Sequence, residues 1–336
     1  MIHLGADSTS LAHAARLLRD GQLVAFPTET VYGLGGDAAN PEAVASIFRA
    51  KGRPADHPVI VHMASADALP RWASHVPESA QHLAEAFWPG PLTLVLRRAD
   101  GVSDAVTGGQ DTVGLRVPGN PVALDLLRAF GGALAAPSAN RFGHVSPTTA
   151  AHVLTEFGDS EVAAVVDGGP CRVGVESTII DLSGARPALL RHGMIAIEAI
   201  EAVLNEPLER VGDQQGPRAS GRLASHYAPR AVVELVAVGA LEERVETCLA
   251  ADESIAVLAR RGPQCTTSRA AWIEMPDQPA PFAQALYSAL RQADAACPDR
   301  ILVERPPDTA GWEAISDRLQ KASTPRSPIS GTTGAL

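Results

Sequence analysis

The feature that most limits the folds open to this chain is an alternation of helix-like and strand-like segments over its first 205 residues. Short apolar runs such as "LVAF" (23–26) and "LTLVLR" (92–97) have the length of buried strands, and helix-like stretches lie among them. Such an alternation favours an α/β architecture, in which helices are layered on a sheet. We predict helices over residues 8–20, 41–51, 78–87, 122–130, 148–156 and 197–204, and strands over 23–26, 59–63, 92–97, 113–117, 134–136, 162–166, 178–182 and 188–191.

A segment over residues 206–230 interrupts this alternation, because it is rich in Gly, Pro, Ser and charged residues. That composition is typical of a linker between domains. A second, shorter alternation follows and predicts a smaller, Rossmann-like α/β domain over residues 231–322. We therefore expect a first domain over residues 1–205, the linker, the small domain, and a disordered tail over residues 323–336.

Composition and charge exclude several classes of protein. No apolar run approaches the roughly 18 residues of a membrane span, and the N-terminus lacks the profile of a signal peptide, so we expect a cytoplasmic enzyme with no membrane partner. The four cysteines lie far apart, which argues against a structural zinc site or a disulfide framework. The net charge of −10 does not indicate a nucleic-acid-binding protein.

The stretch "GQLVAFPTETVYGLGGDAAN" (21–40) contains, from Gly33, the G-x-G-x-x-A pattern of dinucleotide-binding loops. In such a site the first glycine directly follows a strand, and an acidic residue ends the next strand. Here six residues separate Phe26 from Gly33, and the next predicted strand ends near His62 without a carboxylate. The pattern therefore does not indicate a nicotinamide or flavin site. The strand end "PTET" still places hydroxyl and carboxylate groups at a sheet edge, where open α/β sheets bind ligands.

Lysine is rare in this chain, since only Lys51 and Lys321 of the 28 basic residues are lysine. Lys51 and Arg53 lie on a turn after a predicted helix, where two cations suit a phosphate or a carboxylate; a solvated basic turn is the alternative. Arg116 lies in an otherwise apolar strand and needs an anionic partner. The residues alone leave open whether the protein or a ligand supplies that partner.

The segment "APSANRFGHVSPTTA" (136–150) places several polar side chains between a predicted strand and a predicted helix. Hydroxyls, an amide and a helix N-terminus suit an anion or a nucleotide. The alternative role for a hydroxyl here is to cap the helix, which we expect of Thr148. The candidates for ligand contact are Ser138, Asn140 and Ser146.

Six segments occur together in the order and spacing of the YrdC family, which comprises the threonylcarbamoyl-AMP synthases, and over residues 8–205 the chain resembles that family. The linker motif "SHYAP" and the final "WEAISDRLQKA" resemble the two-domain form of the enzyme, as far as about residue 322. The resemblance implies a twisted, open mixed sheet with helices, of the YrdC type, followed by the small domain. The six segments are "FPTETVYGLG", "KGRP...HPVIVH", "VGLRVP", "APSANRFG...SPT", "VDGG...GVESTIID" and "LLRHG".

The resemblance also implies a nucleotidyltransferase that makes L-threonylcarbamoyl-AMP from L-threonine, bicarbonate or CO2, and ATP, and releases diphosphate. The product serves the threonylcarbamoyladenosine modification of tRNA. Carried over by motif, the catalytic cations are Lys51 and Arg53, and the threonine site comprises Thr30, His62, Arg116, Ala136 and Ser177. The ATP contacts are Arg53, His57, Thr112, Ser138, Asn140, Ser146, Arg191 and Tyr227.

The same resemblance implies which cofactors and partners the protein has and what its linker does. It implies Mg2+ entering with ATP, no organic cofactor and no protein metal ligand, and it implies a downstream tRNA threonylcarbamoyl transferase complex as partner. Tyr227 resembles the linker tyrosine that folds over the active site as a lid, and a passive tether is the alternative. Before "SHYAP" the chain reads "RASGRLA", where the family commonly has Ser-Pro-Gly and an apolar residue, so the path of the lid is open.

Two other functions are alternatives to this one. YrdC-like domains also occur in carbamoyl transferases, but those larger proteins add metal-binding or acylphosphatase-like regions that this chain lacks. A double-stranded RNA-binding module is the second alternative, and the acidic composition limits it to a weak RNA contact.

Overall fold

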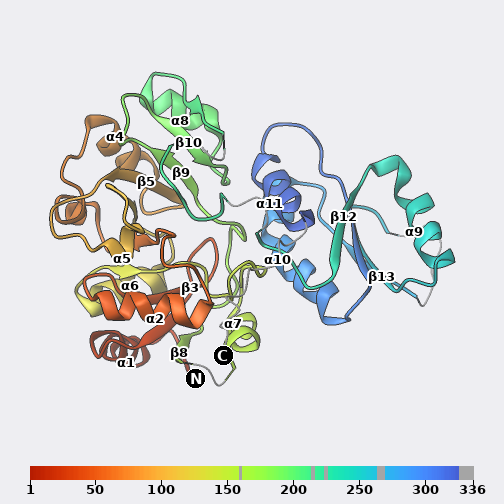
Figure 1. The fold of residues 1–336 in the computed structure, drawn as a ribbon, viewed down its shortest axis with the longest axis horizontal. Helices are drawn as coiled ribbons and strands as arrows, with labels where there is room; N and C mark the ends of the chain where they lie inside the picture. The colour runs from red at the N-terminus through yellow and green to blue at the C-terminus, as the bar shows by residue number, and fades with distance from the viewer. Residues whose placement is uncertain (159–160, 213–215, 223–225, 263–268, 325–336) are drawn as a thin grey trace, which may run out of the picture.

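The computed structural model describes residues 1–158, 161–212, 216–222, 226–262 and 269–324, which form two β-sheets covered by helices (Figure 1). Both parallel and antiparallel strand pairs occur in the large sheet. Its strands are β1 (Ile2–Leu4), β2 (Leu23–Phe26), β3 (Gly33–Asp37), β4 (Ile60–His62), β5 (Leu92–Arg97), β6 (Thr112–Arg116), β7 (Leu134–Ala135), β8 (Val162–Val166), β9 (Thr178–Asp181), β10 (Ala188–Arg191) and β11 (Glu209–Arg210). Their order in space is β1-β8-β2-β3-β7-β4-β6-β5-β9-β10-β11.

Helices cover both faces of the large sheet, because its strands alternate their apolar side chains between two cores. Val24 and Phe26 pack with α1 and α6, whereas Leu23 and Ala25 lie in the core that includes α2, α4 and α7. The layered α/β arrangement that the alternation predicted is confirmed, and so is the mixed sheet that the family resemblance implied. The helices are α1 (Ser8–Arg19), α2 (Pro41–Lys51), α3 (Leu69–Trp72), α4 (Glu78–Phe87), α5 (Asp104–Thr107), α6 (Pro121–Phe130), α7 (Ala150–Phe157) and α8 (Ile197–Leu204), with a 3-10 turn, η1 (Ala66–Ala68).

Local capping chemistry fixes where several helices begin. The side chains of Asn40 and Asn120 accept backbone N–H bonds at the starts of α2 and α6, and each is followed by a proline in the first turn. For α7 our expectation was wrong: Thr149, not Thr148, caps the helix, since its side chain accepts from the His152 N–H. Thr148 instead contacts Ser288 of the second domain, with 3.0 Å between the two hydroxyl oxygens.

The glycine pattern that begins at Gly33 forms a strand that the sequence analysis missed. Residues 33–37 are β3, which pairs antiparallel with β2, so Gly33 and Gly35 lie inside a strand and not on a strand-to-helix turn that could hold a pyrophosphate. A methyl group added at Gly35 would lie 2.8 Å from Cε1 of Phe26 and 3.1 Å from the Val24 carbonyl oxygen. The glycine lets two strands and an aromatic ring approach closely.

The second sheet is entirely parallel, as the α/β prediction requires. Its order is β12 (Val232–Val236), β15 (Arg300–Glu304), β13 (Ile255–Ala259) and β14 (Ala270–Glu274). Ile255 and Val257 pack on one side with α9 (Leu241–Ala250), which follows the 3-10 turn η2 (Val238–Ala240). Ala256 and Leu258 pack on the other side with α10 (Pro279–Ala295) and α11 (Glu313–Ser323).

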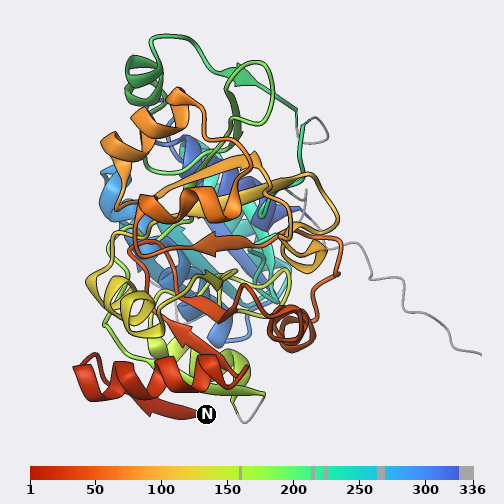
Figure 2. The ribbon, with the colours of Figure 1, turned by 90° about the vertical axis from the view of Figure 1, so that its left-hand side faces the viewer.

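Helices α10 and α11 lie on the side of the second sheet that faces the large sheet, and α9 lies on the far side (Figure 1). Turned by 90°, the molecule shows the large sheet in front and the second domain behind it (Figure 2). The approach is close at Gly174, where a methyl group would lie 2.3 Å from the carbonyl oxygen of Ala283 in α10. Glu156 of α7 forms an ion pair of 2.9 Å with Arg291 of α10. Side chains of the second domain can therefore reach the large sheet.

Our domain boundaries at residues 205, 230 and 322 stay predictions. Most of the predicted tail, residues 325–336, lies outside the described residues, as do parts of the predicted linker. Within the described residues, no helix has the length and apolarity that crossing a membrane requires.

The packing at Gly35 generates a stability prediction. We expect Gly35→Ala to lower the free energy of unfolding by about 1–3 kcal/mol, because the new methyl group overpacks the contact between Phe26 and the strand backbone. Urea denaturation measures the change. The control is Gly239→Ala, where an added methyl group meets nothing within 4 Å. Equal stabilities of the two variants would contradict the packing role of Gly35.

Candidate active site

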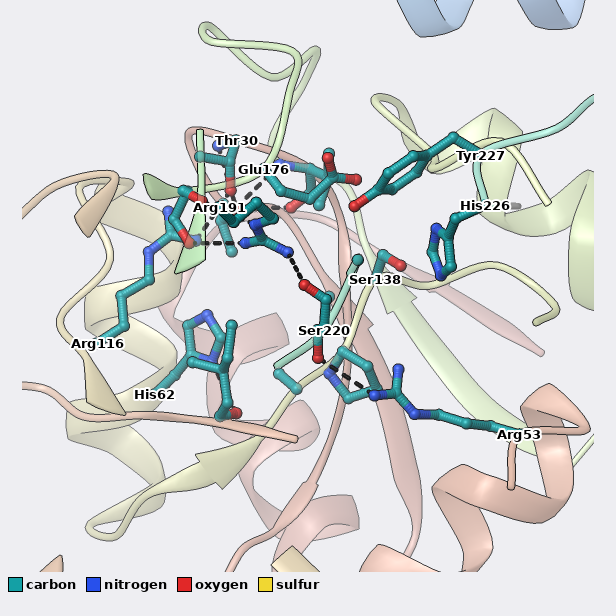
Figure 3. A pocket seen from close by; sticks show the side chains of 18 residues that line it. Thr30, Arg53, His62, Arg116, Ser138, Glu176, Arg191, Ser220, His226 and Tyr227 are labelled. Atoms are coloured by element: carbon teal, nitrogen blue, oxygen red, sulfur yellow. Dashed lines mark hydrogen bonds between the residues drawn. The ribbon is translucent and has the colours of Figure 1, made fainter. Parts of the chain in front are cut away.

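A buried cavity lies where several strand ends of the large sheet meet residues of the linker (Figure 3). It encloses about 50 Å3. Its walls come from the loop after β2, the ends of β4, β6, β7 and β10, the segment before β9, and the linker. The predicted site residues that line it are Thr30, Arg53, His62, Arg116, Ala136, Ser138, Ser177, Arg191 and Tyr227.

Arg116 is paired by the protein, which answers the question that its strand position raised. Its Nη2 donates to Oε1 of Glu29 at 2.6 Å, its Nη1 to the Thr30 hydroxyl at 3.0 Å, and its Nε to the Gly90 carbonyl at 3.2 Å. Both side chains of the ion pair are only 4% exposed. Removing one partner of such a pair costs about 3–5 kcal/mol, so Glu29 fixes the guanidinium in place. Oε2 of Glu29 has no hydrogen-bond partner among the described residues.

His62 and Ser177 complete this side of the cavity. Burial, reinforced by the Arg116 charge, lowers the pKa of His62 to about 3, so the ring is neutral at neutral pH. The Ser177 hydroxyl lies 2.8 Å from the Thr93 hydroxyl and accepts from Nη2 of Arg191 at 3.0 Å. This wall therefore offers one fixed cation, a neutral imidazole and two hydroxyls.

Arg53 and Arg191 form a second group of cations, and the linker residue Ser220 lies between them (Figure 3). Nη2 of Arg53 donates to the Ser220 hydroxyl at 3.2 Å, and Nη1 of Arg191 donates to the Ser220 carbonyl at 2.8 Å. Within the described part of the chain, no carboxylate lies within ion-pair distance of either guanidinium. Burial lowers the pKa of Arg53 to about 10 and that of Arg191 below its usual value. Two desolvated cations that meet only neutral oxygens form a strong anion site.

Lys51 does not line the cavity, although it was our first candidate for a catalytic charge. Its ammonium group donates to the carbonyl oxygen of Ser138 at 2.5 Å and to that of Asn140. The side chain is buried, and burial lowers its pKa well below the usual range. In this structure the lysine ties the end of α2 to the 138–140 loop.

Four further predicted ATP contacts, namely His57, Thr112, Asn140 and Ser146, lie beside the cavity rather than on its wall. Thr112 lines a neighbouring pocket that shares Ile60 and Ser220 with the cavity, so the linker separates the two spaces. His57 lies edge-on to Phe142, with 5.6 Å between the ring centroids. The Asn140 amide group donates to the Arg141 and His144 carbonyls.

Glu176 is a wall residue that the sequence analysis did not assign to the site. It accepts from the Ser146 hydroxyl at 2.6 Å, from the Tyr287 hydroxyl at 2.8 Å and from Nε of Arg318 at 2.8 Å. Burial opposes ionisation of this carboxyl group, but the charges of Arg318 and Arg191 outweigh it and lower its pKa to about 2. Two of its three donors belong to the second domain, so a search confined to the first 205 residues could not find them.

Tyr227 closes the cavity from the linker side. It is buried and has a left-handed backbone, with φ of 61°. Its ring stacks on Tyr287 at 5.8 Å, and the Arg318 guanidinium lies 5.2 Å from its centroid. The neighbouring His226 packs edge-on against Phe142 at 6.0 Å, and burial lowers its pKa to about 3. A left-handed non-glycine residue costs about 1–3 kcal/mol, which these contacts of the ring offset.

Comparison with known proteins identifies the family. A family profile of the Sua5/YciO/YrdC type, described as "Telomere recombination", matches residues 16–193, and one described as "Threonylcarbamoyl-AMP synthase, C-terminal domain" matches residues 195–324. The chain belongs to the two-domain Sua5/YrdC family of threonylcarbamoyl-AMP synthases.

Individual relatives of this Sua5/YrdC protein cover nearly its whole length. It is 41% identical to the threonylcarbamoyl-AMP synthase of Pyrococcus abyssi (strain GE5 / Orsay) over 92% of this chain and 93% of that protein. It is also 41% identical to the enzyme of Bacillus subtilis (strain 168), over 95% and 94% respectively. The crystal structure of "P. abyssi Sua5 complexed with L-threonine" has a TM-score of 0.89 at 39% identity and covers 96% of this chain and 97% of that one. The predicted family is confirmed.

The buried His62 generates a prediction on pH dependence. A histidine titrates near pH 6.5 in an unfolded chain, whereas His62 stays neutral in the folded protein down to about pH 3. As the pH falls, the unfolded state binds the proton first, so the stabilising contribution is complete above pH 6.5 and is lost progressively below it.

Between pH 7 and pH 5, we expect the unfolding free energy to fall by about 2 kcal/mol more in the wild type than in His62→Gln. This window lies above the range in which Glu176, with a pKa near 2, begins to lose its contribution. Urea denaturation of both proteins at the two pH values measures the difference. Parallel pH dependences of the two proteins would show that His62 is not held neutral.

Proposed function

We propose that this chain synthesises L-threonylcarbamoyl-AMP from L-threonine, bicarbonate or CO2, and ATP, with release of diphosphate, for the threonylcarbamoyladenosine modification of tRNA. The observation that carries the proposal is the pair Arg53 and Arg191. Both cations are buried at one cavity, and among the described residues neither has a carboxylate partner. A chain of phosphates supplies the missing negative charge.

Threonine is proposed to bind on the wall formed by Thr30, His62, Arg116, Ala136 and Ser177. Glu29 and Thr30 each take one N–H of the Arg116 guanidinium, and Gly90 takes a third, which leaves two N–H groups for an amino-acid carboxylate. That a P. abyssi relative binds L-threonine supports this assignment. The hydroxyls and the neutral imidazole suit the hydroxyl and amine groups of the substrate.

The reaction needs positioning and charge stabilisation rather than a covalent nucleophile. The threonine amine loses a proton and forms a carbon–nitrogen bond to CO2, which gives a carbamate. A carbamate oxygen then bonds to the α-phosphorus of ATP, while the bond from that phosphorus to the bridging oxygen breaks and diphosphate leaves with the electron pair. Arg53 and Arg191 stabilise the charge on the phosphates, and burial strengthens their effect.

For Lys51 we propose a positioning role, since its ammonium group holds the carbonyls of Ser138 and Asn140. The remaining proposed ATP contacts are His57, Thr112, Ser138, Asn140, Ser146 and Tyr227. Mg2+ is proposed to enter on the phosphates of ATP. No group of three or more His, Cys, Asp or Glu side chains is arranged to hold a metal ion in the described ranges, and the oxygens of Glu176 already accept three hydrogen bonds.

The linker is proposed to act as a lid. A pocket that holds a ligand of the size of ATP needs roughly 300–1,000 Å3. The cavity has a volume of only about 50 Å3. Ser220 presents two oxygens to Arg53 and Arg191, where phosphate oxygens would bind. Ser220 and Gly221 must therefore withdraw when ATP enters. Arg222 supports this path, because it donates to the carbonyls of Gly212 and Pro217 in the same linker.

The carbamoyl transferase alternative is disfavoured by the second profile match, over residues 195–324, which is to the C-terminal domain of threonylcarbamoyl-AMP synthases. A weak RNA contact and a downstream transferase complex remain proposals from family resemblance.

The deciding experiment measures diphosphate release from ATP and bicarbonate with and without L-threonine, and identifies the product by mass. We expect threonine-dependent release and a threonylcarbamoyl-AMP mass.

Arg191→Met should lower kcat/KM for ATP by about 100-fold or more. Among the described residues Arg191 has no carboxylate partner, so the substitution leaves no carboxylate of this part of the chain unpaired. The control is Arg128→Met, whose ion pair with Asp125 is exposed. Turnover of carbamoyl phosphate without threonine would move the assignment to the carbamoyl transferases.

The lid proposal predicts opposite effects of two changes at Ser220. Ser220→Ala should lower KM for ATP about two- to tenfold, because the linker loses one hydrogen bond to Arg53. Ser220→Asp should raise KM for ATP, because a carboxylate on the linker competes with the phosphates for both arginines. KM values from the same diphosphate assay test both. Effects of equal sign would support the passive tether.

A further inference from the structure

Glu176 lies between two arginines but is bonded to only one of them. Arg318 of α11 donates from Nε to Oε2 at 2.8 Å, and the Tyr287 hydroxyl of α10 donates to the same oxygen at 2.8 Å. Arg191 lies on the cavity side of the carboxylate (Figure 3). Across the described residues, no ion pair joins Glu176 to Arg191. A carboxylate on the cavity wall is thus held by the second domain.

This geometry matters because a carboxylate next to the proposed phosphate site is a competitor of the substrate. A buried charge that loses its partner takes another partner or destabilises the fold. For Glu176, the neighbouring cation on the cavity wall is Arg191, whose hydrogen-bond partners among the described residues are oxygens of Ser177 and Ser220. A bond between Glu176 and Arg191 would cancel one of the two charges available for ATP.

The second domain surrounds Glu176 with a cluster of paired charges. Arg318 is buried, with side-chain exposure of 0%, and bonds Glu176 and Asp317, while Lys321 pairs with Asp317 at 2.7 Å. Two cations and two carboxylates balance within this cluster. The other Glu176 oxygen accepts from Ser146 at 2.6 Å, which fixes the plane of the carboxylate.

We propose that Arg318 and Tyr287 are positioning residues through which the second domain holds Glu176 away from Arg191 and so keeps Arg191 free for the phosphates of ATP. The proposal rests on the proposed function, and it gives the second domain a part in ATP binding. The same two residues hold the lid, since Tyr227 stacks on Tyr287 and lies against Arg318. Lys321 also donates to the Gly221 carbonyl of the lid at 2.7 Å. Arg318 and Tyr287 therefore hold both the Glu176 carboxylate and the lid.

The test is a double-mutant cycle in the diphosphate-release assay, on the full chain. We expect Arg318→Met to raise KM for ATP by about tenfold or more, because Glu176 is then free to pair with Arg191. Adding Glu176→Gln removes the competing charge, so the double variant should recover most of the ATP affinity that Arg318→Met loses. A purely structural role of Arg318 predicts no recovery, and that result would overturn the proposal.

A second, milder cycle covers the case in which Arg318→Met does not fold. Tyr287→Phe keeps the ring that stacks on Tyr227 and removes only the hydroxyl that bonds Glu176. It should raise KM for ATP, and the effect should vanish in the Glu176→Gln background. The matched control is Ser288→Ala, the next residue of α10, which bonds Thr148 across the same interface without touching Glu176. Equal effects of Tyr287→Phe and Ser288→Ala would refute the proposal.

The assay separates failure of this inference from failure of the proposed function. A wild-type protein without threonine-dependent diphosphate release refutes the function, and the inference falls with it. An active wild type whose Arg318 and Tyr287 variants keep the wild-type KM for ATP refutes the inference alone.

Discussion

The structure around the cavity depends on partners for buried cations, because each buried guanidinium group needs hydrogen-bond acceptors or a carboxylate. Arg53, Arg116, Arg191 and Arg318 are each at most 8% exposed, and a buried guanidinium without partners costs several kcal/mol. Arg116 pairs with Glu29 and Arg318 with Glu176, whereas Arg53 and Arg191 bond only neutral oxygens in the part of the chain that the structure describes. The same burial that makes the unopposed pair expensive makes it a strong site for phosphates. All four residues are arginines, and their partners alone distinguish Arg116 and Arg318, which pair with carboxylates, from the proposed phosphate-binding pair Arg53 and Arg191.

The topology of the large sheet brings these cations together. Parallel pairing of β4 with β6 places His62 directly beside Arg116, and parallel pairing of β5 with β9 brings Ser177, just before β9, to the same edge. Arg191 reaches that edge because β10 runs antiparallel to β9. Loops are free to carry the polar groups because the strands beneath them are fixed by two apolar cores. The cavity is a consequence of strand order more than of any single loop.

Local chemistry explains which elements could be predicted. Helices α2 and α6 begin at Asn-Pro, and α2 was predicted with its observed bounds, residues 41–51. Strand β3 was missed because glycine has a low strand propensity, and glycine there is explained by close tertiary contacts such as that of Gly35 with Phe26 and Val24. Strand β14 and the two-residue β11 carry weak periodicity. The cap of α7 was placed one residue early because three consecutive positions, Pro147, Thr148 and Thr149, all suit a helix start.

The sequence by itself determined the α/β class, the family and half of the residues on the cavity wall, because short motifs at strand ends carry that information within a few residues. Only the tertiary structure decided what those residues do to one another. It assigned Glu29 to Arg116, turned Lys51 to backbone carbonyls, and brought Tyr287 and Arg318 to Glu176 across more than 100 positions of the chain. Such pairings depend on how two sheets pack, and no local pattern encodes the distance between side chains that meet only after the chain has folded.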